Sequence, residues 1–320
     1  MISIEKVNFR DHKVDLITVE NNSKLKVVFT SFGAAIYKVY FADRLVTGEI
    51  KDLDKYFTSG MFLGKSVGRT CGRIKDGIAK INNVEYKINK YGKHSLHGGI
   101  YGFSFRMFTY QIFETEKGIE IKFFYTSKDM EEGYPGDLDV EVSYLIDNNQ
   151  DVIEITYSSI SNKDTICNLT NHAYFNMNGA KNDFLKQKMM INADQYIDID
   201  DELIFKGIKD VEGPMSFKNL RKFVDDCIDY GEVNLYDHDY ILNGVLPNAI
   251  LTSENEDMSL EIVTNNPILH IYTGPLDGSF NKLGTAIECE KKAYDMNDIY
   301  LPKGERRIQK SIYTFKMKGE

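Results

Sequence analysis

The chain has 320 residues, 42% of them hydrophobic and 27% charged, a composition typical of a folded globular protein rather than a disordered one. Its formal net charge of −9 argues against binding to nucleic acids or to anionic membranes. No segment approaches the roughly 20 apolar residues that span a bilayer, and the N-terminus lacks the apolar centre of a signal peptide. We therefore expect a soluble, cytoplasmic protein.

Most of the chain shows the two-residue alternation of β-strands. An early helix is plausible between residues 52 and 61, and residues 119–125 are strand-like. Tyr134-Pro-Gly136 fits a type II turn. Apolar residues then alternate over 138–146 and again over 153–157, and a polar turn joins the two runs. This pattern predicts an antiparallel hairpin.

The second half of the chain continues in the same way. Residues 217–227 have helical spacing and predict one short helix, whereas residues 258–263, 268–272 and 312–317 predict strands. The sequence shows no alternation of strands and helices, no internal repeat and no linker, which disfavours a doubly wound sheet. We expect one domain over residues 1–320, all-β, built as a large antiparallel sandwich.

Four cysteines are spread through the chain without a Cys-x-x-Cys pair: Cys71, Cys167, Cys227 and Cys289. This spacing does not fit a zinc site, and four cysteines in so long a chain do not make a disulfide scaffold. We expect free thiols in a reducing compartment, and neither a metal nor another cofactor.

Two histidines and a late pair of carboxylates are the candidates for chemistry. His97 precedes Gly98-Gly99, and His172 lies in a polar segment, Asn168-Leu-Thr-Asn-His172. Glu288 and Glu290 are two residues apart and so face the same side of a strand. Histidine donates a proton near neutral pH and a carboxylate accepts one. Taken alone, the local sequence favours the plainer reading of structural histidines and a solvated strand face.

Six short segments occur in a telling order: 68–74, 96–99, 171–176, 236–238, 272–274 and 287–290. Together they resemble the aldose 1-epimerase (galactose mutarotase) family, from about residue 20 to the C-terminus. The resemblance implies a large twisted two-sheet antiparallel β-sandwich with a few short helices, the galactose mutarotase-like supersandwich, and a site in a cleft on one face. It implies an isomerase that needs no cofactor.

The resemblance also implies roles for single residues. His172 matches the proton donor to the sugar ring oxygen, Glu290 the general base, and His97 a histidine that binds near the ring oxygen and assists catalysis. A further set matches or neighbours the positions that hold the substrate: Arg73, Asp237, Asn171 and Tyr272. Tyr272 suits packing against an apolar sugar face, and a core tyrosine is the alternative.

Some positions depart from the family pattern. Glu288 falls where the family usually has an apolar or small residue, Lys292 where it commonly has glutamine, and Gly72 where it has asparagine. We prefer Glu290 to Glu288 as the base because Glu290 keeps register with the downstream strand. The departures leave the preferred aldose open.

The predicted function is interconversion of the α and β anomers of a free aldohexose such as galactose or glucose. One alternative is an epimerase for hexose 6-phosphates, for which Arg69, Lys291 and Lys292 are the available cations. The other is a non-catalytic sugar-binding module of the same fold. A small sugar is the expected partner, with neither nucleic acid nor membrane, and the chain is expected to be a monomer or a weak homodimer.

Overall fold

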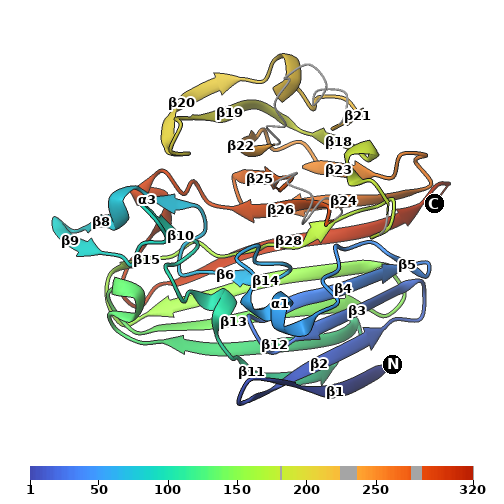
Figure 1. Ribbon diagram of the computed structural model, residues 1–320, viewed down its shortest axis with the longest axis horizontal. Coiled ribbons are helices and arrows are strands. Elements are labelled where there is room, and N and C mark those ends of the chain that lie inside the picture. The colour runs from blue at the N-terminus through green and yellow to red at the C-terminus, as the bar shows by residue number, and fades with distance from the viewer. Residues whose placement is uncertain (181, 224–235, 275–282, 320) are drawn as a thin grey trace.

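The computed structural model describes residues 1–180, 182–223, 236–274 and 283–319, and Figure 1 shows how their strands are layered. The largest sheet has nine strands, and the order of the strands across the sheet is not their order in the chain. Across the sheet they are β11 (Thr109–Glu114), β12 (Gly118–Ser127), β13 (Leu138–Asp147), β14 (Val152–Ser161), β28 (Arg306–Met317), β24 (Met258–Thr264), β23 (Ala249–Thr252), β18 (Lys188–Ile191) and β21 (Arg221–Lys222).

The alternation seen in the sequence explains the middle of this sheet. In β13 Val140, Val142 and Tyr144 are buried, whereas Asp139 is exposed. The predicted hairpin is confirmed, because β13 pairs antiparallel with β14 and Ile146 lies opposite Ile153. Gly136 has a φ of +81°, as the third position of a type II turn requires.

Two further sheets pack against the nine-stranded sheet. The first has five strands, and the ring of Phe29 lies 4.8 Å from that of Tyr144 in β13. Its strands are β1 (Ile2–Phe9), β2 (His12–Glu20), β3 (Leu25–Thr30), β4 (Ala35–Phe41) and β5 (Arg44–Leu45). The second has six strands, and the ring of Phe175 lies 5.5 Å from that of Tyr313 in β28. Its strands are β17 (Tyr174–Phe175), β26 (Thr285–Glu290), β25 (Ile268–Tyr272), β22 (Asp237–Leu242), β19 (Ala193–Ile199) and β20 (Phe205–Asp210).

Short elements complete the fold. Two-stranded pairings join β6 (Ser66–Val67) to β16 (Thr170–Asn171), β7 (Arg73–Ile74) to β10 (Ser95–Leu96), β8 (Ile78–Ile81) to β9 (Val84–Lys87), and β15 (Thr165–Ile166) to β27 (Tyr300–Leu301). The described α-helices are α1 (Leu53–Thr58) and α3 (Met296–Ile299). Five 3-10 turns are η1 (Lys75–Gly77), η2 (Phe103–Phe105), η3 (Glu131–Gly133), η4 (Phe184–Lys186) and η5 (Gly213–Met215). No helix in the described part of the chain is long and apolar enough to cross a membrane.

The structure confirms most predicted elements and corrects one. The helix expected between residues 52 and 61 is α1, and the later strands are β24, β25 and β28. The helix predicted over residues 217–227 is wrong where it can be compared, since 217–223 contain a turn and the short strand β21, and residues 224–227 lie outside the described ones. Phe217 and Phe223 have helical spacing, yet they pack together with ring centroids 5.5 Å apart as part of the core of the sandwich.

Candidate active site

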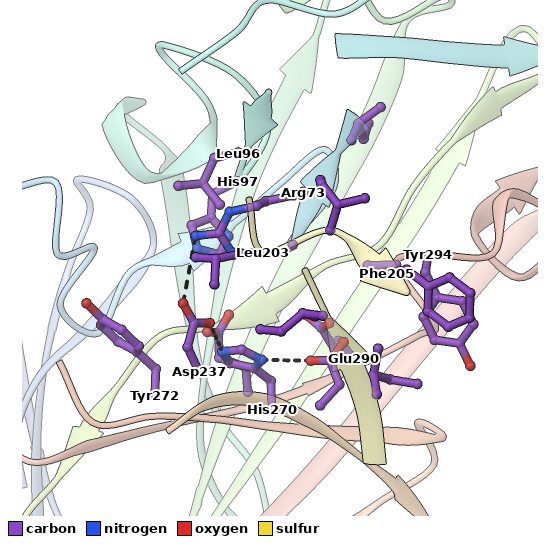
Figure 2. Close-up of a pocket in the computed structure, with 18 of the residues that line it drawn as sticks. Arg73, Leu96, His97, Leu203, Phe205, Asp237, His270, Tyr272, Glu290 and Tyr294 are labelled. Atoms are coloured by element: carbon purple, nitrogen blue, oxygen red, sulfur yellow. Dashed lines mark hydrogen bonds and ion pairs between the residues drawn. The ribbon is translucent and has the colours of Figure 1, made fainter. Parts of the chain in front are cut away.

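A cavity of about 380 Å³ opens on one face of the six-stranded sheet, and Figure 2 shows the side chains that line it. Ionisable and hydroxyl side chains gather on one part of its wall: Arg73, Lys75, His97, His172, Tyr174, Asp237, Asp239, His270, Tyr272, Glu288 and Glu290. Pockets that bind small molecules combine a few converging polar groups with apolar walls. This cavity is therefore the candidate site.

Three neighbouring strands supply the floor of the pocket at every second position. β22 contributes Asp237 and Asp239, β25 contributes His270 and Tyr272, and β26 contributes Glu288 and Glu290. Asp237 pairs with Tyr272, while His270 lies between Asp239 and Glu288 across the sheet. Successive side chains of a strand point to opposite faces. On β25 and β26 the residues that alternate with them accordingly belong to the core: Leu269, Ile271, Ile287 and Cys289.

The two histidines come from the short pairings above the sheet. The backbone N–H of His172 donates to the carbonyl of Lys65 at 3.0 Å, and its own carbonyl accepts from Gly64 at 2.9 Å. His97 follows β10 with a φ of +49°, in the left-handed region that non-glycine residues seldom adopt. The centroids of the two imidazole rings lie 5.4 Å apart with the ring planes at 89°, and both residues line the cavity.

The glycine after His97 is required by the backbone. Gly98 has a φ of +90°, and a Cβ atom there would lie 1.8 Å from the carbonyl oxygen of Gly68. The requirement comes from the close packing of two backbone segments, which holds the His97 loop in place.

Glu288 is the carboxylate that contacts the histidine pair. Its Oε1 lies 3.3 Å from Nε2 of His172, and the two side chains are 1% and 4% exposed. The other carboxylate oxygen of Glu288 and the Nδ1 atoms of His97 and His172 are buried without a hydrogen-bond partner within the described residues. Buried polar atoms nearly always have partners, so these three atoms are available to a ligand.

Burial shifts the two members of this pair in opposite directions. It raises the pKa of Glu288 to about 8, because a carboxylate loses its hydration there. It lowers the pKa of His172 to about 3, and the nearby charge of His270 adds to that effect. At pH 7 the pair therefore holds one proton, which the 3.3 Å contact allows to pass between the two side chains.

Glu290, the base preferred in the sequence analysis, lies one step further along β26. It lines the same pocket and is 2% exposed. Burial raises the pKa of its carboxyl group, the neighbouring Asp239 and Glu288 add to the shift, and the Cys71 thiol forms a hydrogen bond with it. The contact with His172 belongs to Glu288.

The structure places Arg73, His97, His172, Asp237 and Tyr272 around the pocket, as the sequence analysis expected.

Asn171 is the exception and needs correcting. Its amide nitrogen donates to the carbonyl of Gly64 at 2.8 Å and to the hydroxyl of Tyr144 at 3.2 Å, and its oxygen accepts from the N–H of Ala173. Asn171 thus braces the turn that carries His172, and its side chain does not line the cavity.

Two pocket residues were missed by the sequence analysis, Asp239 and His270. Nδ1 of His270 lies 2.7 Å from Oδ1 of Asp239, and Nε2 lies 3.3 Å from Oδ1 of Asp237. Asp237 in turn lies 3.8 Å from Nη2 of Arg73. The available signal was position, since each is two residues from a predicted site residue on the same strand.

The cations suggested for a phosphorylated sugar lie elsewhere. Arg69 is 2% exposed and donates to Ser127 and to the carbonyls of Lys128 and Pro135. Nζ of Lys291 lies 2.9 Å from Asp298. Neither of these cations lines the pocket, and Lys292 does not line it either.

The far end of the pocket is apolar. The rings of Phe205 and Tyr294 stack with centroids 4.4 Å apart and planes 6° from parallel. Figure 2 shows them on the opposite side of the pocket from Tyr272.

One group of side chains has the geometry to hold a metal ion. Within the described residues, His97, His172 and Glu288 each bring a donor atom within 4.8 Å of the other two. Histidine nitrogens and a carboxylate oxygen are ligands that suit Zn²⁺. The same atoms are the ones that a proton-transfer site requires.

Comparison with known proteins identifies the family. The family model for aldose 1-epimerase matches residues 15–313. The chain belongs to the aldose 1-epimerase family. It is 34% identical to an aldose 1-epimerase from Haemophilus influenzae over 81% of this chain and 78% of that one. It is 32% identical to a galactose mutarotase from Bos taurus, over 87% and 84% of the two chains.

The fold of this aldose 1-epimerase family member agrees with a solved structure. A galactose 1-epimerase from Lactobacillus acidophilus superposes with a TM-score of 0.89, covering 99% of both chains at 24% identity. The expected all-β sandwich, the family resemblance, the isomerase class and the mutarotase function are thereby confirmed. The alternatives of a hexose 6-phosphate epimerase and a binding module are not favoured.

Proposed function

We propose that this aldose 1-epimerase interconverts the anomers of a free aldohexose, such as galactose or glucose, with Glu288 and His172 as the two proton-transferring groups. The observation that carries the assignment is their buried 3.3 Å contact inside the pocket. The sequence analysis assigns the base to Glu290, which lines the same pocket and stays the alternative. We propose Glu288 because its carboxylate contacts His172.

The reaction needs one proton removed and one added. The pair reacts in the form in which its shared proton has passed from Glu288 to His172 across the 3.3 Å contact. The ionised Glu288 takes the proton from the C1 hydroxyl while His172 gives its proton to the ring oxygen, and the C1–O5 bond breaks. The open-chain aldehyde rotates about C1–C2. The ring then closes on the other face of the carbonyl with the proton transfers reversed. Each positioned proton transfer contributes roughly 10²–10⁴-fold in rate.

The remaining polar groups hold the sugar. Arg73 offers guanidinium donors and Asp237 carboxylate acceptors to the hydroxyls, and the unpartnered Nδ1 of His97 faces the same space. Tyr272 presents its ring to an apolar sugar face. The pocket suits a neutral substrate with many hydroxyl groups. Asp237 and Asp239 are already in contact with the positively charged His270, and Glu288 and His172 share a proton.

We further infer that the enzyme works in the cytoplasm as a monomer or weak homodimer, with its sugar as the partner. The acidic composition supports this inference, and so do Cys71, Cys167 and Cys289, which are all free thiols. Cys227 lies outside the described residues. Light scattering after size exclusion would test the oligomeric state, and a tetramer would contradict it.

The test is proton NMR of the anomeric signals of freshly dissolved α-D-galactose and α-D-glucose, with and without protein. We expect Glu288→Gln and His172→Gln to lose at least 10²-fold in kcat, because each removes one proton transfer, while sugar binding by calorimetry persists. Glu290→Gln is the matched control, the same change two residues along β26, and should keep most of the rate.

Other outcomes assign the site differently. If Glu290→Gln is inactive and Glu288→Gln is active, the base is Glu290. If the unmodified protein accelerates neither sugar, the proposed function fails. A chelator should leave the rate unchanged, whereas a loss that Zn²⁺ restores would place a metal on His97, His172 and Glu288.

A further inference from the structure

We propose that His270 is a positioning residue that fixes the Asp237 carboxylate for one hydroxyl of the sugar, and that it thereby sets which hydroxyl pattern the enzyme accepts. The inference rests on the proposed function, since it concerns the hold on the same substrate. Figure 2 shows Asp237 and His270 side by side on the pocket floor, with Arg73 above Asp237.

The two strands bring the three charged groups together. In the antiparallel pairing of β22 with β25, Asp239 lies opposite His270 and Asp237 opposite Tyr272. His270 uses both ring nitrogens, Nδ1 to Asp239 at 2.7 Å and Nε2 to Asp237 at 3.3 Å. Its side chain is 17% exposed, so water competes little for these contacts.

The charges support one another. Burial alone would lower the pKa of His270, but hydrogen bonds to Asp237 and Asp239 raise it well above the ordinary value, so the ring stays charged at neutral pH. Burial alone would raise the pKa of Asp237, yet His270 and then Arg73 hold it below its usual range. The result is a line of alternating charge: Asp239, His270, Asp237 and Arg73.

In this row of charges His270 contacts Asp237, and Asp237 is the residue that contacts the sugar. His270 has no ring nitrogen left for a ligand, so it acts through Asp237 and not on the sugar. An ionised carboxylate accepts up to about four hydrogen bonds, and Asp237 spends one oxygen on His270 and meets Arg73 loosely at 3.8 Å. Lone pairs of Asp237 therefore remain for a sugar hydroxyl.

A held carboxylate discriminates more sharply than a loose one. A sugar that lacks the matching hydroxyl leaves the half-buried Asp237 carboxylate one hydrogen bond short, which the site penalises. If the carboxylate can rotate freely, it forms hydrogen bonds with water or other groups, and the cost of binding a sugar without that hydroxyl becomes smaller. The role of His270 should therefore appear in the comparison of sugars with and without that hydroxyl.

The experiment measures kcat and KM for glucose and for 2-, 3- and 4-deoxyglucose. The unmodified enzyme should turn over one deoxy sugar with kcat/KM at least tenfold below the others, and Asp237→Asn should abolish that difference. We expect His270→Gln to raise KM for glucose about tenfold, change kcat less than twofold, and shrink the difference toward that of Asp237→Asn. Asp237→Asn/His270→Gln should be no worse than Asp237→Asn alone, as for residues acting as one unit.

Two variants guard the conclusion. His238→Gln removes a neighbouring half-buried histidine outside the pocket, whose ring packs on Tyr196 and whose Nδ1 accepts from the backbone N–H of Asp237. It leaves the contacts of the Asp237 carboxylate with His270 and Arg73 in place and should keep the discrimination. Asp239→Asn weakens the other hydrogen bond of His270 while leaving His270 itself unsubstituted. It replaces His270→Gln as the test variant if His270→Gln does not fold. The inference is overturned if the active enzyme keeps its full discrimination in both His270→Gln and Asp239→Asn. An unmodified protein without mutarotase activity would instead overturn the proposed function.

Discussion

Next to the His172 segment lies a buried lysine, Lys65, that forms no ion pair with a carboxylate of the described residues. Lys65 is fully buried, and its Nζ donates to the carbonyl of Phe57 at 2.9 Å. The rings of Phe32, Tyr56 and Phe105 surround it, with the centroid of Phe105 at 4.5 Å. Burial lowers the pKa of Lys65 to about 7. Cation–π contacts offset part of the lost hydration, and the rest is a cost to the folded state.

Lys65→Met should therefore stabilise the protein, and the gain should depend on pH. The folded pKa of about 7 lies below the unfolded value of about 10.4, so the unfolded chain binds the proton more tightly. The cost is complete below pH 7 and fades as pH rises toward 10. Urea unfolding should show a gain of about 1–3 kcal/mol at pH 6 and little or none at pH 10. A difference that does not change with pH would contradict this account.

Residue types and their order identified His97, His172, Arg73 and Asp237, all of which line the pocket. Their roles remain predictions. The sequence favours Glu290 over Glu288 as the base, and that choice stays a prediction; what the sequence could not show is that Glu288 is the one that lies beside His172. The sequence also could not show that the strand face carrying His270 lines a pocket. A two-residue period separates the two faces of a strand, but it does not show what packs against each face.

The hairpin of β19 and β20 contributes apolar side chains to the lining of the pocket: Ile197, Ile199, Leu203, Ile204 and Phe205. Its tip is shaped by Asp200, whose carboxylate accepts the N–H groups of Glu202 and Ile204. Glu202 also reaches the segment that carries His97, through Lys93 and through a 3.3 Å contact with Nε2 of His94. These contacts join two segments that are distant in the sequence and that both contribute to the pocket lining.

Removing the Glu202 contacts should loosen the β19–β20 hairpin without changing the proton-transfer groups. We expect Glu202→Gln to raise KM for the sugar about 2- to 5-fold and to leave kcat unchanged, the size expected when one exposed ion pair is lost. Glu212→Gln, an exposed glutamate further along the chain, is the control. A fall in kcat with constant KM would show that the hairpin takes part in the reaction step instead.

At the scale of elements, period-two patterns located the strands well, because half-buried strands must alternate. Helical spacing misled at Phe217 and Phe223, where a turn and a short strand bring the two rings to the same cluster. The sheet order was beyond the sequence, because β28 inserts between β14 and β24, which lie far apart in the chain.

The whole molecule is built around one large apolar cluster. It includes residues from Ile17 in β2 to Phe315 in β28, so it draws on the five-, six- and nine-stranded sheets alike. The C-terminal strand lies inside the nine-stranded sheet and pairs on both sides. A core shared in this way favours a single folding unit despite the length of the chain.

The one-domain prediction can be tested by unfolding. We expect far-UV and near-UV circular dichroism to report coincident urea transitions, because no sheet can keep its packing once another is lost. Removing residues 306–320 should abolish folding of the whole chain rather than of the last strand alone. Two separate transitions would divide the chain into more than one domain.

Pocket residues occupy every second position on β22, β25 and β26, and this spacing restricts how the sequence of the enzyme can change during evolution. One residue inserted within Thr285–Glu290 would reverse the faces of the strand beyond it, sending carboxylates into the interior and Ile287 or Cys289 outward. Descendants can therefore vary the lengths of the connections around the cavity, and with them the sugars they choose. On the strands, they inherit the proton-transfer groups in fixed register and can alter them only by exchanging one side chain for another.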